Sequence, residues 1–177
     1  MIALLLAAAL APQLAEQIRA TLPPGPPPRI EALAQTGELL LFCLVGRDRA
    51  QVEAARVKEG KLQGDPEDLG GPLRREGCGA AELGASFEVR RGRKRQRAVV
   101  VHLKDAGLSA VVSLSAKILA WTDAPAPDGG PAIFPEPGKG DTTFCAFLPR
   151  TQAWGRVAWV EDVGEYAPTT GDGCRGR

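Results

Sequence analysis

Residues 87–115 read FEVRRGRKRQRAVVVHLKDAGLSAVVSLS, and this stretch carries the clearest structural signal in the chain. Apolar residues, mostly Val, dominate 97–103 and 110–115, whereas a turn containing Lys, Asp and Gly fills 104–109. Another polar turn separates 97–103 from the shorter run 87–91. Val-rich runs separated by turns are typical of strands joined by hairpins. The stretch therefore predicts a three-stranded antiparallel meander.

Further strands are expected on both sides of the meander. Residues 38–45 form a continuous apolar run between Gly37 and Gly46, which indicates a strand buried on both faces. Residues 117–121 extend the last strand of the meander or begin another, and two more strands are expected at 142–148 and 154–160. We therefore predict a mainly β fold, an antiparallel sandwich or open barrel with one or two short helices. An α+β fold is the alternative.

The expected helices lie near the N-terminal strand. Asp48 offers an N-cap with Gln51 three residues on, and Gly60 offers a stop, so residues 49–59 are predicted to form a short helix. Residues 30–35 are predicted to form one or two helical turns. The Gly- and Pro-rich segments 63–84 and 122–141 and the tail from residue 167 are expected to be irregular.

Length and composition favour one domain without a metal or cofactor. The chain has 177 residues, of which 44% are hydrophobic and 24% charged, as in ordinary globular domains. Its only histidine is His102, so no multi-histidine metal site can form within one chain. We expect a single β-rich domain over residues 29–177, with no metal site and no cofactor.

The N-terminal segment is predicted to direct export. Ten apolar residues follow Met1 and end at Ala11, as in the core of a signal peptide, here residues 1–11. The alternative is an apolar amphipathic helix extending to residue 21. The run is too short to span a bilayer, and residues 12–28 are expected to form a short helix and a Pro-rich linker. The predicted location is therefore secreted or periplasmic.

Four cysteines support that location. An even number of cysteines, with no closely spaced pair, suits disulfides in an oxidising compartment better than a zinc or redox site. Cys43 and Cys145 lie in strand-like apolar runs, whereas Cys78 and Cys174 lie in Gly-rich loops. We therefore favour the pairs Cys43–Cys145 and Cys78–Cys174. The other two pairings, and buried free thiols, remain open alternatives.

The most distinctive charged segment is the turn inside residues 87–103. It holds six cations within eight residues: Arg90, Arg91, Arg93, Lys94, Arg95 and Arg97. A hairpin carrying them would present a positive field to an anionic macromolecule or an acidic protein surface. The alternative is a solvated hairpin whose charges prevent edge-to-edge strand pairing. Nucleic acid is not the favoured partner, because no aromatic residues are interleaved for base stacking.

Other candidate sites have weaker support. His102 could contact Ser109 or Ser113 across a hairpin, but there is no nucleophile elbow and Asp105 has no clear route to the ring. The Gly-Lys-Gly stretch within 137–143 lacks the spacing of a phosphate loop. Two further sets complete the candidates: the acidic residues Glu161, Asp162, Glu165 and Asp172, which match no calcium loop, and Trp121, Trp154 and Trp159, which are expected in the core.

The leading hypothesis is an exported, disulfide-containing domain that binds or serves a structural role, with the segment 90–97 as its contact surface. A binding role is favoured over an enzymatic one because no catalytic set is complete. One alternative is a hydrolase using His102 with a nearby Ser. The other is a nucleic-acid-associated protein, whose binding would weaken steeply with salt.

Overall fold

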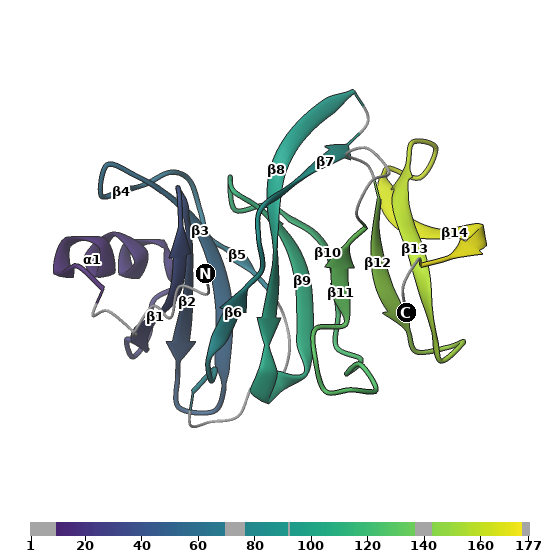
Figure 1. Ribbon diagram of the computed structural model, residues 1–177. Coiled ribbons are helices and arrows are strands. Elements are labelled where there is room, and N and C mark those ends of the chain that lie inside the picture. Colours follow the sequence, from purple (N-terminus) through teal and green to yellow (C-terminus); the bar gives the residue numbers. More distant parts are fainter. Residues whose placement is uncertain (1–9, 70–76, 92, 137–142, 175–177) are drawn as a thin grey trace.

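The computed structural model describes residues 10–69, 77–91, 93–136 and 143–174. These residues form one α-helix and three antiparallel sheets, which confirms the predicted mainly β fold with a short helix (Figure 1). Most of the predicted signal peptide, residues 1–9, lies outside the described residues. Within the described residues no helix is long and apolar enough to cross a membrane.

The N-terminal sheet is built from hairpins. Its order is β1-β2-β3-β4, and β5 also pairs with β3. The bounds are α1 Pro12–Thr21, β1 Arg29–Thr36, β2 Leu39–Val45, β3 Ala50–Lys58, β4 Lys61–Leu62 and β5 Glu67–Asp68.

The central sheet contains the predicted meander. Its order is β10-β9-β8-β6, and β7 pairs with the first half of β8. The C-terminal sheet follows in the order β11-β12-β13-β14. The bounds are β6 Ala81–Leu83, β7 Phe87–Arg91, β8 Lys94–Leu103, a 3-10 turn Lys104–Ala106, β9 Leu108–Ser113, β10 Ile118–Thr122, β11 Ile133–Pro135, β12 Thr143–Leu148, β13 Ala153–Val160 and β14 Glu165–Gly173.

The three sheets stack as layers, with the central sheet in the middle (Figure 1). Along β8, Val99 and Val101 belong to the core shared with the N-terminal sheet, whereas Val100 belongs to the core shared with the C-terminal sheet. Side chains of a strand point alternately to its two faces, so a sheet covered on both sides needs apolar residues at every position. This explains why residues 98–103 are buried at every position, with His102 as their one polar side chain, although the sheet is antiparallel.

The helix covers the outer face of the N-terminal sheet. Leu14 and Ile18 of α1 pack against a cluster that includes Leu40 and Phe42 of β2. The other face of β2, including Leu41, packs against the central sheet. The expectation of a strand buried on both faces is confirmed for β2.

Two expected helices are strands in the structure. Residues 30–35 belong to β1, and residues 49–59, predicted as a helix, contain the whole of β3. β3 pairs with β2 through a short turn, from Val45 opposite Ala50 to Leu39 opposite Arg56. The helix prediction was wrong because the cap signal at Asp48 is weaker than this pairing, which buries small and β-branched side chains on both faces.

Several segments expected to be irregular also contain strands. β5 and β6 lie within 63–84, and β11 lies within 122–141. The tail is not loose from residue 167, because β14 pairs with β13 from Val160 opposite Glu165 to Gly155 opposite Gly173. β5, β6 and β11 have only two or three residues each, too few to show a period.

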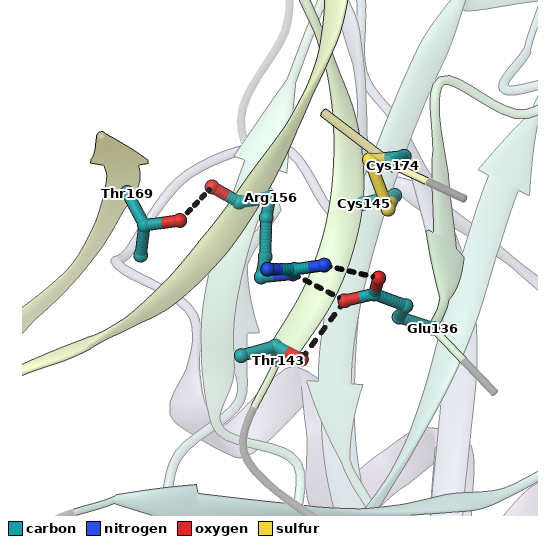
Figure 2. Close-up of a disulfide and its surroundings, with 6 residues drawn as sticks. All are labelled: Glu136, Thr143, Cys145, Arg156, Thr169 and Cys174. Atoms are coloured by element: carbon teal, nitrogen blue, oxygen red, sulfur yellow. Dashed lines mark hydrogen bonds and ion pairs between the residues drawn. A yellow bond between two sulfur atoms is a disulfide. The ribbon is translucent and has the colours of Figure 1, made fainter. Parts of the chain in front are cut away.

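The four cysteines form two disulfides, as predicted, but the favoured pairing was wrong. The bonds are Cys43–Cys78 and Cys145–Cys174, with Cα–Cα distances of 5.8 and 5.9 Å. Cys43 and Cys78 belong to the core between the N-terminal and central sheets. Cys145 lies on β12 in the C-terminal sheet, where it is bonded to Cys174 (Figure 2). The central sheet lies between β12 and the strand of Cys43 (Figure 1), so Cys145 cannot reach Cys43. The structure describes no free cysteine.

Candidate anion-binding hairpin

The six predicted cations lie on the hairpin of β7 and β8. The register runs from Phe87 opposite Ala98 to Arg91 opposite Lys94. β9 pairs with β8 only from Ala98 onward, so the first part of β8 is paired with β7 alone. We call residues 90–97 the basic hairpin. It projects beyond the other strands of the central sheet, at the top of Figure 1.

Like charges oppose each other across the basic hairpin. Arg90 lies opposite Arg95, and Arg91 lies opposite Lys94. Directly opposed residues on antiparallel strands have Cβ atoms about 5 Å apart, and like charges in such pairs are destabilising. Arg90, Arg93, Lys94, Arg95 and Arg97 are exposed. The fold therefore holds a concentrated positive field at a projecting edge, at some cost in stability.

One face of the hairpin carries a row of arginines. Because side chains alternate along β8, Arg95 and Arg97 share the face of Val99, which points toward the N-terminal sheet. Arg90 lies opposite Arg95 on that face. Residues two apart on a strand are roughly 7 Å apart, so this face offers cations at regular intervals.

Local contacts hold this row of arginines in place. Arg95 forms an exposed ion pair with Glu88 at 3.3 Å, and the Arg97 guanidinium donates to Ser86 Oγ at 2.7 Å. The Tyr166 hydroxyl donates to the carbonyl of Arg90 at 2.9 Å, which ties the hairpin to β14. Val89 is buried in the core shared with the C-terminal sheet. The base of the hairpin is thus anchored on two sides.

A recess lies at the foot of the arginine face. It has a volume of about 310 Å³ and is lined by Glu38, Gln96, Arg97, Leu114 and Ser115. Glu38 accepts a hydrogen bond from Arg56 Nε at 2.6 Å, and the Ser115 hydroxyl shares a hydrogen bond with Ser113 at 2.9 Å. Sequence reasoning missed this recess because it arises from packing between the two sheets.

The predicted His–Ser contact exists, but it is buried. His102 Nδ1 lies 3.2 Å from Ser109 Oγ, and that oxygen also accepts a hydrogen bond from the amide of Ala132 at 2.9 Å. Ser109 has no exposed surface, and His102 is 5% exposed. His102 Nε2 has no hydrogen-bond partner among the described residues. A nucleophile at this position has no open path to a substrate, so the pair is a poor hydrolase site.

The remaining candidates do not form a site in the described part of the chain. Residues 137–142, which hold most of the Gly-Lys-Gly stretch, and the side chain of Asp172 lie outside it. Among the described residues no cluster of three or more His, Cys, Asp or Glu could hold a metal ion. Trp154 and Trp159 are half-buried in aromatic contacts, but Trp121 is 56% exposed, so its expected core position was wrong. It lies on β10, at an edge of the central sheet, where packing is incomplete.

Two buried carboxylates, those of Glu136 and Glu53, were not predicted from the sequence. Glu136 and Arg156 form a bidentate pair with distances of 2.6 and 2.7 Å, beside the Cys145–Cys174 disulfide (Figure 2). Glu53 is buried on the N-terminal sheet, and desolvation by burial raises its pKa, although a hydrogen bond from Gln51 opposes the shift. A charged residue inside an otherwise apolar strand was the available signal for Glu53.

Comparison with known proteins leaves the fold and the hairpin as the basis for assigning a function. No protein-family model matches the chain, and no curated protein and no solved structure matches it either.

Proposed function

We propose that this protein is an exported, disulfide-containing domain that binds anionic partners through the basic hairpin. The observation that carries the proposal is the register of a projecting strand pair, in which Arg90 lies opposite Arg95 and Arg91 lies opposite Lys94. Bringing a polyanion to this edge would relieve the repulsion between them. Such binding would also release counterions from the polyanion.

Export is supported by the two disulfides. Disulfides persist in oxidising compartments and are rare in reducing ones. Each bond ties a strand to a distant segment, with sequence separations of 35 and 29 residues. Intact-mass analysis of the protein from its native host, after thiol alkylation without reductant, tests this part. Four alkylated thiols on an unprocessed chain would contradict export.

The hairpin's role is tested by neutralising Arg93, Lys94 and Arg95 to Gln together. The probes are polygalacturonate and inorganic polyphosphate, measured by fluorescence anisotropy at several salt concentrations. We expect the triple variant to lose at least tenfold in affinity for both polymers and to show a shallower dependence on salt.

A matched control separates the hairpin from net charge. Neutralising Arg47, Lys58 and Lys61 removes three exposed cations from the turns of the N-terminal sheet, far from the hairpin in sequence. This control should lose less than threefold. Equal losses in the two triple variants, or no binding by the unaltered protein, would refute the proposed function.

A further inference from the structure

The recess at the foot of the basic hairpin combines groups of different chemistry. Arg97 supplies a positive charge, the Ser115 hydroxyl supplies a polar group, Glu38 supplies a carboxylate, and Leu114 supplies an apolar surface. Its volume of about 310 Å³ lies at the lower end of the range for small-ligand sites, roughly 300–1,000 Å³. The recess is therefore large enough for a compact ligand group, and its lining suits a group that has both polar and apolar surfaces.

Glu38 is the group that narrows the choice of ligand. A carboxylate repels phosphate or sulfate, so a site built only for a polyanion would exclude it. Arg56 binds Glu38 Oε2, and Glu38 Oε1 has no partner among the described residues. An ionised carboxylate oxygen can accept a hydrogen bond but cannot donate one, so a hydroxyl group of a ligand is a suitable partner for Glu38 Oε1.

The recess is also continuous with the arginine row. Arg97 lines the recess and lies on the same face of the hairpin as Arg95 and Arg90. A chain-like ligand that places one unit in the recess could therefore run outward along these cations. The ligand needs negative charge along its length, hydroxyl groups, and an apolar C–H face to pack on Leu114.

Resting on the proposed function, we infer that the anionic partner is an acidic polysaccharide, one sugar unit of which sits in the recess. Its carboxylate contacts Arg97, and one of its hydroxyls donates to Glu38. Single-stranded nucleic acid fits less well, because its bases would need aromatic stacking partners, and a DNA duplex has no sugar hydroxyls along its length to donate to Glu38. The residues that line the recess include no aromatic side chain.

A charge-conserving variant tests this inference. Glu38→Gln together with Arg56→Gln removes one negative and one positive charge, so the net charge is unchanged, but the strong acceptor is gone. Both side chains are partly exposed, at 38% and 43%, so the fold should be preserved; circular dichroism checks this. We expect affinity for polygalacturonate to fall roughly ten- to hundredfold, the loss of one hydrogen bond to a charged group. Affinity for inorganic polyphosphate, which has no hydroxyl groups, should stay within twofold.

The single variants supply an independent check. Ser115→Ala should weaken polygalacturonate binding without changing polyphosphate binding. Arg56→Gln alone should weaken both polymers slightly, because it only removes positive charge. If the double variant binds polygalacturonate as well as the unaltered protein does, the sugar assignment is wrong. It is also wrong if the double variant loses equal affinity for polygalacturonate and for polyphosphate.

The two proposals fail in different ways. If neither polymer binds, or if the hairpin triple variant binds both normally, the proposed function itself fails. If both polymers bind through the hairpin but a 20-base-pair DNA duplex binds tighter than polygalacturonate, only the polysaccharide assignment is overturned.

Discussion

Replacing Arg156 with Met should destabilise the C-terminal sheet severely. Glu136 is 1% exposed in its side chain and Arg156 is 11% exposed, and two short hydrogen bonds join them. The Thr143 hydroxyl donates to the same carboxylate at 3.2 Å (Figure 2). Without Arg156 the carboxylate stays buried without its cation, which costs about 3–5 kcal/mol. For a chain of this size we expect the Tm to fall by roughly 6–20 °C.

The assay is urea unfolding at pH 7 without reductant, followed by tryptophan fluorescence. The informative control is the double variant Glu136→Leu with Arg156→Met, which removes both charges and should recover most of the loss. Glu136→Leu alone should cost about as much as Arg156→Met alone. If the double variant loses the sum of the two single losses, or if Arg156→Met costs less than about 1 kcal/mol, the pair is not acting as a buried ion pair.

Three further predictions concern stability. Burial, with a smaller contribution from the charge of Asp68, raises the pKa of Glu53 above its ordinary 4.5, so the folded state holds the proton more tightly. Glu53→Gln should therefore be more stable than the unaltered protein at pH 7, and this difference in stability should disappear below about pH 4. Urea unfolding midpoints at several pH values measure it, and a difference in stability that grows at low pH would contradict the prediction. The Ile18 side chain in α1 is fully buried, so Ile18→Ala should lower the free energy of unfolding by about 2–5 kcal/mol. Glu16→Ala, at an exposed position of the same helix, should lower it by less than about 0.5 kcal/mol. Removing the Cys43–Cys78 bond by double Ala substitution should cost about 4 kcal/mol, from the separation of 35 residues, and an unchanged thermal midpoint would refute that.

Long apolar runs were the part of the fold that could be predicted from the sequence. β2, β9 and the second half of β8 are buried at nearly every position, and their runs are bounded by turn residues. The two C-terminal strands were placed within one residue of β12 and β13, and the four-cysteine count led correctly to two disulfides.

What could not be predicted depends on how the layers stack. A sandwich predicted from six or so strands does not specify that the central sheet is covered on both faces, and without that layer order nothing separates Cys43 from Cys145. The recess also forms only where Glu38, from one sheet, faces Arg97, from another. β3 was misassigned for a local reason, since Asp48 and Gln51 mimic a helix start.

The two cross-links divide the polypeptide into lengths of different extensibility. Residues 43–78 and 145–174 are closed loops, whereas the whole stretch between Cys78 and Cys145, including every strand of the middle layer, lies in neither. If the two ends of the oxidised chain were pulled apart, only the segments outside the two disulfide loops could extend. The two loops, with sequence separations of 35 and 29 residues, hold roughly 220 Å of extended chain, which becomes available only when the disulfides are reduced. The layer that carries the charged projection is thus the one whose cohesion depends entirely on non-covalent contacts.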